Sequence, residues 1–368
     1  MFLTIIVFIV ILGLLVFVHE FGHFLAAKKA GVKVEEFAFG FPPRLWSIKR
    51  EGTIYAINAI PLGGYVKLLG EEGEITSAKG GVKIPGTGSS SAQKDSFAHK
   101  SVLTRIWIVV AGVLMNFILA IVLMTIGFCI GMTPLVSDPS QMVGQKESKV
   151  MVLAVAPGSA AANAGIGAND IINGFSSITD LQQFTKQNAG KEVKISIQKN
   201  NQNQEMLVKL SDKQDSPLGV SIVSITKIKQ NLGQAFVTSI VETGKVIGTL
   251  FIFLGDMIKN IFTTGHAGAA AQGVVGPIGL FNFTAAAIKV GWIYVLQLVI
   301  LLSINLGIVN ILPFPALDGG KVLFLALEGL FRKKVVRQEI ENIIHLVGFA
   351  LLILLFVAIT FKDVRNFF

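Results

Sequence analysis

The sequence predicts a polytopic α-helical membrane protein with four transmembrane helices, a membrane-associated β-hairpin region and one extracytoplasmic α/β domain. Of its 368 residues, 52% are hydrophobic and only 15% are charged, whereas a soluble globular chain carries about 25% charged residues. The apolar residues gather in long runs, and a helix needs about 20 of them to cross a bilayer. Shorter segments with Gly, Pro and alternating apolar residues lie between these runs and predict strands.

Four apolar runs are expected to span the membrane: residues 1–27, 106–130, 292–318 and 340–361. The first run has no basic residue in front of it, is long for a cleaved signal peptide, and is followed directly by Lys28 and Lys29. It is therefore interpreted as a retained anchor whose N-terminus lies outside.

The basic residues are distributed as membrane topology would distribute them. Residues 28–105 contain 12 Lys and Arg, whereas residues 131–291 contain 13 in twice the length, and none of these is Arg. By the positive-inside rule, residues 28–105 form a cytoplasmic loop and the second segment lies outside. The net charge of +9 therefore does not indicate nucleic acid as a partner.

A fifth apolar stretch, residues 235–262, carries Glu242, Lys245, Asp256 and Lys259. If it crossed the membrane, the later spans would reverse direction and carry the end of the 292–318 run to the face opposite the first helix. We therefore expect an amphipathic helix that lies at the outer membrane interface.

The cytoplasmic loop has two parts of different composition. Phe37–Gly70 alternates apolar residues with Gly and Pro, which predicts short strands or a hairpin at or dipping into the membrane. Thr76–Ser96 is rich in Gly, Ser and Lys, and is predicted to be a flexible linker.

His19, Glu20 and His23 form an H-E-x-x-H motif inside the first apolar run. Residues four apart share a helix face, so the two imidazoles can bind one zinc ion, while Glu20 can act as a general base toward water. In a soluble helix the motif often occurs by accident. A bilayer offers these side chains no water, so three ionisable groups at this depth favour a metal site.

A catalytic zinc site usually has three protein ligands, and Asp318 is the best candidate for the third. It follows Asn310 and two prolines, Pro313 and Pro315, that must break the helix and can turn a carboxylate inward. The alternative is that Asp318 only caps a helix end at the cytoplasmic boundary.

Residues 134–229 form an extracytoplasmic insert with its own pattern of short strands and helices. The segments Pro157–Ala161, Ala164–Ile166 and Asn169–Ile172 resemble those of PDZ domains of the circularly permuted bacterial type. Such domains bind a peptide terminus as an added strand, so a peptide ligand in the groove is expected. The alternative is a degenerate domain that acts as a plug or spacer.

Together, these motifs resemble the site-2 protease family of intramembrane zinc metalloproteases, of the RseP type. The resemblance covers nearly the whole chain and includes Gly112-x-x-x-Asn116, Ile60–Val66 and Gly276–Gly279. The sequence departs from the family pattern at Lys321, where His or Arg is expected, and at Val113, which replaces a usual proline. The single PDZ domain also leaves open any substrate gating by tandem domains.

The resemblance implies a role for each matched residue. It implies zinc (Zn²⁺) as the cofactor, held by His19, His23 and Asp318, with Glu20 as the general base. Asn310 matches a residue that contacts the substrate near the scissile bond, although from the residues alone it can equally tie two helices together. The positions expected to bind substrate are Asn116, Gly63, Gly64 and Tyr65.

The function implied is cleavage of transmembrane segments of membrane proteins, as in regulated intramembrane proteolysis of anti-sigma factors or signal-peptide remnants. The expected location is the bacterial cytoplasmic (inner) membrane, with the active site toward the cytoplasm and the lipid bilayer as its surroundings. An alternative is a catalytically silent scaffold or chaperone that acts through its PDZ domain. A transporter is less favoured, because the chain has no convincing inverted repeat of discontinuous helices.

Overall fold

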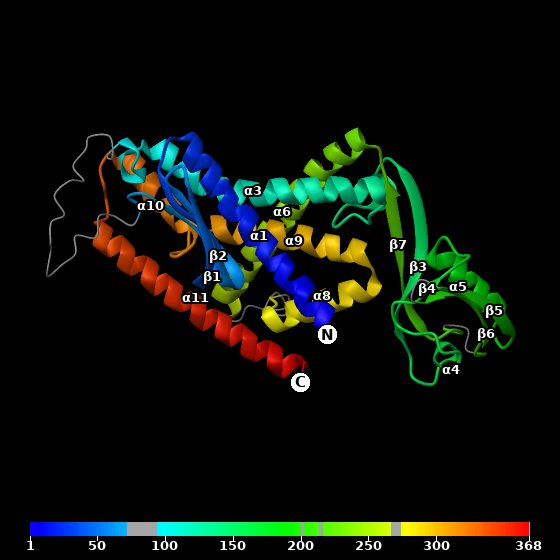
Figure 1. Cartoon of the computed structure of the whole chain (residues 1–368). Helices are drawn as coiled ribbons and strands as arrows, with labels where there is room; N and C mark the ends of the chain where they lie inside the picture. The colour runs from blue at the N-terminus through cyan, green and yellow to red at the C-terminus, as the bar shows by residue number, and fades with distance from the viewer. Residues whose placement is uncertain (72–93, 200–201, 213–215, 266–273, 368) are drawn as a thin grey trace. The chain divides into compact units, whose positions relative to one another are not determined.

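The computed structural model describes residues 1–71, 94–199, 202–212, 216–265 and 274–367 (Figure 1). The linker expected at Thr76–Ser96 lies almost wholly outside these residues. The chain divides into two compact units. We call residues 1–123, 246–285 and 298–368 the membrane unit, and residues 124–245 and 286–297 the second unit.

Five helices in the described part of the chain are long and apolar enough to cross a membrane. They are α1 (Phe2–Lys29), α3 (Val102–Ile130), α6 (Leu232–Thr264), α9 (Trp292–Ile311) and α11 (Gln338–Phe367). The prediction of a multi-pass helical membrane protein is confirmed in this form. The helix α6 occupies the stretch expected to lie at the interface, and the number of helices that cross the bilayer stays a prediction.

Two shorter helices, α8 (Pro277–Val290) and α10 (Asp318–Phe331), were not predicted from the sequence. The helix α9 ends at Ile311, before the predicted boundary at residue 318. Pro313 and Pro315 explain the early end, because each lacks a backbone N–H and clashes with the preceding turn. As a result, Asp318 begins a new helix instead of ending the old one.

The predicted hairpin region is an antiparallel pair of long strands, β1 (Val34–Arg50) and β2 (Thr53–Leu68). The ladder folds back on itself, so that Phe37 pairs with both Val66 and Tyr55. The bend lies at Gly40, whose φ is +84° and where a Cβ would lie 2.7 Å from the Ile60 carbonyl oxygen. A residue other than glycine does not fit this corner.

The second unit contains a five-stranded antiparallel sheet with the strand order β6-β5-β4-β3-β7. Its strands are β3 (Gln145–Val155), β4 (Ile171–Ile172), β5 (Glu192–Lys199), β6 (Gln202–Lys209) and β7 (Val220–Lys229). Two helices, α4 (Ala160–Asn163) and α5 (Ile178–Gln187), begin at serine caps, and the sheet and helices share one apolar core.

The edge strand β7 was missed from the sequence, although Val220, Ile222 and Ile228 carry an alternating signal. The assignment of this unit to the PDZ class stays a prediction.

Candidate functional site

The helix α1 places His19 and His23 one turn apart on the same face. Their Nε2 atoms lie 3.2 Å from each other, and the two side chains are 7% and 13% exposed. The ring of His23 is fixed because its Nδ1 donates a hydrogen bond to the Ile108 carbonyl oxygen at 2.9 Å. With its proton on Nδ1, the Nε2 atom of His23 presents a lone pair to the site.

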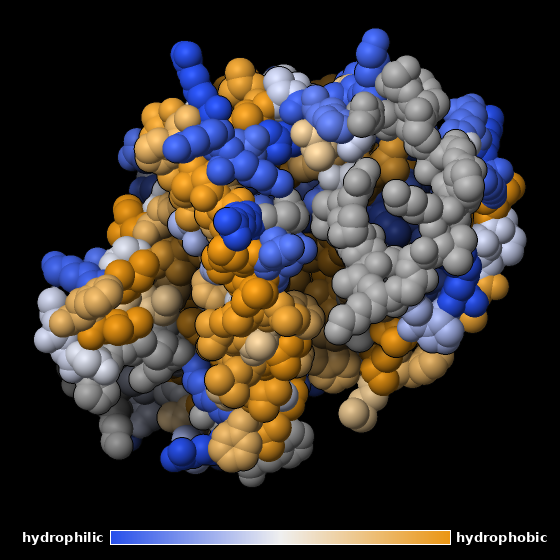
Figure 2. All heavy atoms as spheres, turned by 90° about the vertical axis from the view of Figure 1, so that its left-hand side faces the viewer, coloured by the Kyte–Doolittle hydropathy of each residue, from blue (hydrophilic) through white to orange (hydrophobic). Residues whose placement is uncertain are grey.

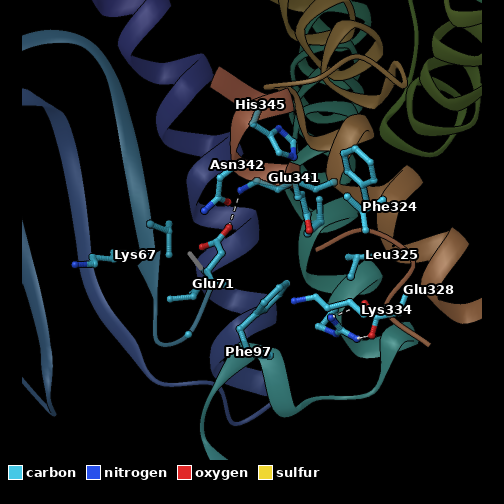
Figure 3. Close-up of a pocket in the computed structure, with 18 of the residues that line it drawn as sticks. Lys67, Glu71, Phe97, Phe324, Leu325, Glu328, Lys334, Glu341, Asn342 and His345 are labelled. Carbon is cyan, nitrogen blue, oxygen red and sulfur yellow. Dashed lines mark hydrogen bonds and ion pairs between the residues drawn. The ribbon is translucent and has the colours of Figure 1, made fainter. Parts of the chain in front are cut away.

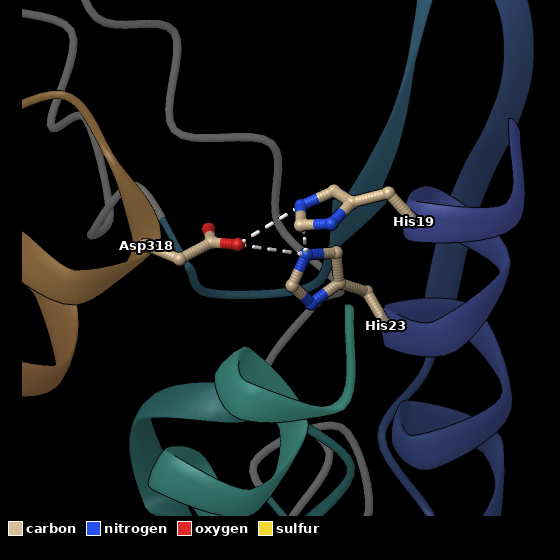
Figure 4. Close-up of side chains that lie close together, drawn as sticks. All are labelled: His19, His23 and Asp318. Atoms are coloured by element: carbon tan, nitrogen blue, oxygen red, sulfur yellow. Dashed lines mark hydrogen bonds and ion pairs between the residues drawn. The ribbon is translucent and has the colours of Figure 1, made fainter. Parts of the chain in front are cut away.

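Asp318 approaches the two imidazoles from the first residue of α10 (Figure 4). Its Oδ2 atom lies 3.0 Å from His19 Nε2 and 3.2 Å from His23 Nε2. Two glycines allow this start of the helix to pack tightly: a Cβ on Gly319 would lie 2.1 Å from the Leu312 carbonyl oxygen, and one on Gly320 2.5 Å from that of Phe314.

The three converging atoms fit a zinc ion. Each is a lone-pair donor, and Asp318 Oδ2 is buried without a hydrogen-bond partner in the described part of the chain. Such atoms repel one another unless a cation lies between them. A tetrahedral zinc site with bonds near 2.0–2.1 Å separates its ligand atoms by about 3.3 Å, close to the distances found here. Three protein ligands leave the fourth position open, as catalytic zinc sites require.

Helix packing next to the histidines depends on two glycines. A Cβ on Gly112 of α3 would lie 2.4 Å from His23 Nε2 and 2.9 Å from His19 Cε1, while one on Gly22 of α1 would lie 2.4 Å from the Ala111 carbonyl oxygen. The backbones of α1 and α3 therefore touch directly at the site. The motif at 112–116 pointed to this region, but the sequence carried no sign of the contact with Gly22.

Asn116 has a different neighbour from the one expected. Its side chain is fully buried, and its amide nitrogen lies 3.2 Å from His19 Nδ1, while its Oδ1 has no partner in the described part of the chain. If His19 binds zinc through Nε2, its Nδ1 carries the proton and needs an acceptor. Turning the amide of Asn116 meets both needs, because Oδ1 then accepts from Nδ1. The buried side chain of Asn116 therefore lies against His19, and its predicted contact with substrate stays a prediction.

Asn310 lies next to the converging atoms. Its Nδ2 is 3.2 Å from His19 Nε2, and the residue belongs to the last turn of α9. The amide N–H groups therefore lie beside one of the three converging atoms. This geometry is compatible with donation to an oxyanion.

Glu20 faces the hairpin. A Cβ on Gly64 of β2 would lie only 3.5 Å from Glu20 Cγ, so this strand runs directly beside the carboxylate side chain. The carboxylate also interacts electrostatically with His23, His19 and Asp318. A carboxylate side chain and an extended backbone segment thus lie next to the same three atoms.

The other two residues expected to bind substrate make contacts within the hairpin. Gly63 lies against the ring of Phe41, which a Cβ there would meet at 2.4 Å. Tyr65 donates a hydrogen bond to Glu36 Oε1 at 3.0 Å. Of the three hairpin positions named from the sequence, Gly64 is the one found beside Glu20.

A cavity of about 720 Å³ lies against the start of α10 and is lined also by the end of β2, α3 and α11 (Figure 3). Two ion pairs hold its walls: Lys321 Nζ with Glu71 Oε1 at 2.7 Å, and Arg105 with Glu328. Burial lowers the pKa of Lys321, but the carboxylates of Glu71, Asp318 and Glu20 together raise it by more, so this pKa lies above the ordinary lysine value. Lys321 therefore stays charged, one helical turn from Asp318.

The fold and the site together define a membrane-embedded metalloenzyme. A family model for peptidase family M50 matches residues 7–355. The chain belongs to this family, the site-2 protease family, and is a zinc metalloprotease.

Relatives in other bacteria match along almost their whole length. The chain is 35% identical to a provisionally named zinc metalloprotease of Clostridium acetobutylicum, over 99% of this chain and 98% of the relative. It is 30% identical to the zinc metalloprotease RasP of Geobacillus kaustophilus, over 99% of this chain and 98% of the relative. It is 28% identical to the regulator of sigma-W protease RasP of Bacillus subtilis, over 99% of both chains.

Proposed function

We propose that this protein is an endopeptidase that cuts transmembrane segments of membrane proteins inside the bilayer. The observation that carries the proposal is the convergence of His19, His23 and Asp318 within 4.8 Å of one another, with both histidines on α1, a helix apolar enough to cross a membrane. A protease whose zinc-binding histidines lie on such a helix acts on peptide bonds at the same depth.

Each residue of the site has a part in the proposed reaction. His19, His23 and Asp318 hold the zinc ion, which when bound polarises the peptide carbonyl and lowers the pKa of water. Glu20 takes the proton from the attacking water and returns it to the leaving amine. Asn310 donates a hydrogen bond to the oxygen that becomes negative in the transition state.

The hairpin is proposed to hold the substrate segment in an extended conformation. A helical segment hides its carbonyl groups in internal hydrogen bonds, so it must unwind before a water molecule can attack. The part of β2 around Gly64 lies beside Glu20 and can pair with an unwound segment as an added strand.

Substrate, membrane side and the role of the insert belong to the same proposal. The relative named regulator of sigma-W protease favours membrane-bound regulators, such as anti-sigma factors, as one substrate class, with signal-peptide remnants as another. The asymmetry in Arg content favours a cytoplasmic-side active site in a bacterial inner membrane. The insert at 134–229 is proposed to be a PDZ domain that binds a peptide terminus and selects substrates.

The test is Glu20→Gln, which keeps the shape of the side chain and removes only the base. We expect cleavage of a transmembrane peptide to fall by about 10²–10⁴-fold, while the purified variant binds zinc as the unchanged protein does. Zinc is measured by elemental analysis and cleavage by mass spectrometry.

The control is Glu147→Gln, a change to an exposed carboxylate of the insert, which should leave cleavage unchanged. Full cleavage activity in Glu20→Gln would rule out Glu20 as the general base. Zinc binding without any cleavage by the unchanged protein would support the scaffold alternative instead.

A further inference from the structure

The loop that presents Asp318 has an unfavourable backbone conformation. It joins α9 to α10 through residues 312–317, and Ala316 has a φ of +76°. Residues with a Cβ seldom occupy this left-handed region unless surrounding contacts hold them there. Ala316 lies two residues before Asp318, so the contacts that hold Ala316 also set the position of the Asp318 carboxylate.

The contacts that hold this loop from outside come from α11. The Ala316 N–H donates a hydrogen bond to His345 Nδ1 at 2.9 Å. Nearly one turn later in α11, Gly348 packs against Pro315. A Cβ on Gly348 would lie 2.4 Å from Pro315 Cβ and 2.6 Å from the Pro315 carbonyl oxygen. The peptide group between Pro315 and Ala316 is thereby contacted by one helix at both its N–H and its carbonyl.

The imidazole of His345 is itself held in place. Because Nδ1 accepts from a backbone N–H, the neutral ring carries its proton on Nε2. That nitrogen is buried and has no hydrogen-bond partner in the part of the chain that the structure describes. The ring meets Phe324 of α10 edge-on, with 5.7 Å between centroids. His345 thus lies between the loop and the helix that Asp318 begins.

The rest of α11 is packed loosely. Few of its residues are buried, and its exposed side chains, such as Leu354 and Phe356, are apolar. The side of the molecule that Figure 2 shows carries broad hydrophobic areas of this kind. At its far end, Asp363 Oδ2 accepts a hydrogen bond from the Gly279 N–H at 2.8 Å. Near its start, α11 contacts the loop of Asp318 through His345 and Gly348.

We propose that His345 is a positioning residue that holds the Asp318 loop in its zinc-binding conformation, with Gly348 supplying the close fit. The inference rests on the proposed function, because it assigns the metal to Asp318. Metal ligands tolerate displacements of only a few tenths of an ångström. Releasing Ala316 therefore affects zinc before it affects the fold.

The experiment compares the full-length protein with His345→Ala, His345→Asn and Gly348→Ala. Zinc affinity is measured by competition with a chelator, and kcat and KM with a transmembrane peptide. We expect His345→Ala to weaken zinc binding about 10-fold or more and to lower kcat with little change in KM. His345→Asn should restore both, because its Oδ1 can accept the hydrogen bond from Ala316 in place of Nδ1. Gly348→Ala should act like His345→Ala, because its Cβ pushes Pro315 away.

A second measurement needs no metal. Hydrogen exchange of the peptide that covers residues 312–317 is followed in zinc-free protein, and it should be faster in His345→Ala and Gly348→Ala than in the unchanged protein. The matched control is Gly255→Ala on α6, where a Cβ meets nothing within 4 Å. It should alter neither exchange nor zinc affinity.

The outcomes separate this inference from the proposed function. Wild-type zinc affinity and exchange in His345→Ala would overturn the positioning role, even when the unchanged protein cuts its substrate. An equal loss of zinc affinity in His345→Ala and His345→Asn would also overturn the positioning role, since the loss would then not come from the missing hydrogen bond to Ala316. If His345→Ala does not fold, Gly348→Ala and His345→Asn decide the matter. Failure of the unchanged protein to bind zinc or to cleave would instead remove the proposed function.

Discussion

At the scale of single residues, the site depends on neighbours that fix the direction of each imidazole. His23 is oriented by the Ile108 carbonyl oxygen and His19 by the side chain of Asn116. A histidine that binds a metal through one nitrogen usually donates from the other, and this second contact sets ring orientation and basicity. We therefore propose that Asn116 orients His19 for metal binding without being a ligand itself.

The first prediction at this scale concerns Asn116. Asn116→Leu keeps the volume and removes the acceptor, so zinc affinity should fall about 10–100-fold. Asn116→Asp retains an acceptor for His19 Nδ1 and should keep more of the affinity. Chelator competition on the purified variants measures both. Equal affinity in Asn116→Leu and the unchanged protein would show that Asn116 does not orient His19.

At the scale of elements, the hairpin and α1 form one surface around Glu20. The bend at Gly40, held by the amide of Asn58 donating to the Gly40 carbonyl oxygen at 2.9 Å, returns β2 toward α1. A hydrophobic contact reinforces this arrangement, since a Cβ on Gly13 of α1 would lie 2.9 Å from the ring of Phe39. The strand beside Glu20 is thus placed by residues distant from it in the chain.

The prediction at this scale is that Gly64→Ala impairs cleavage and leaves zinc binding intact. The new Cβ would lie 2.8 Å from the Ala38 carbonyl oxygen, so the strand must shift away from its partner. We expect kcat/KM for a transmembrane peptide to fall about 10-fold, a change of about 1.4 kcal/mol in the barrier. Gly167→Ala in the insert, where a Cβ has ordinary contacts, serves as the control. Unchanged kcat/KM in Gly64→Ala would exclude this strand from substrate binding.

At the scale of the whole molecule, the orientation of the helices in the membrane decides whether the proposed chemistry is possible. A reporter fused near Lys191 should be extracytoplasmic and one near Lys333 cytoplasmic, because Arg is absent from residues 131–291 and basic residues favour the inside. Activity of an enzyme reporter on each side of the membrane measures the result. A reporter near Lys333 found outside would mean that α6 crosses the bilayer and that the expected four-span topology is wrong.

The insert gives the other prediction at this scale. Removing residues 134–229 should leave cleavage of a short transmembrane peptide intact, because the insert contains no His or Cys and the ligand set lies in the membrane unit. The same deletion should weaken discrimination against substrates that still carry a bulky outer domain. Cleavage assays with both substrates measure this. A deletion variant that binds zinc but cannot cut the short peptide would give the insert a catalytic part.

The sequence by itself determined the class of the protein. Composition and run length are sums over many residues, so they indicate a membrane protein whatever the packing. The spacing of His19 and His23 is local, because 3.6 residues per turn place positions four apart on one face. The family came from the resemblance of several motifs along the chain to the site-2 proteases, and the matching family model confirms it.

Only the tertiary structure decided which distant groups surround the motif. Asn116 and Asn310 stand 97 and 291 residues away from His19, and no periodicity predicts such meetings. They follow from helix packing through glycines, from prolines that end α9 early, and from the support of Ala316 by His345. A contact between remote side chains depends on the whole packed arrangement, in which every neighbour restricts the others. The sequence alone therefore did not show the contact of Asn116 with His19 or that of His345 with Ala316.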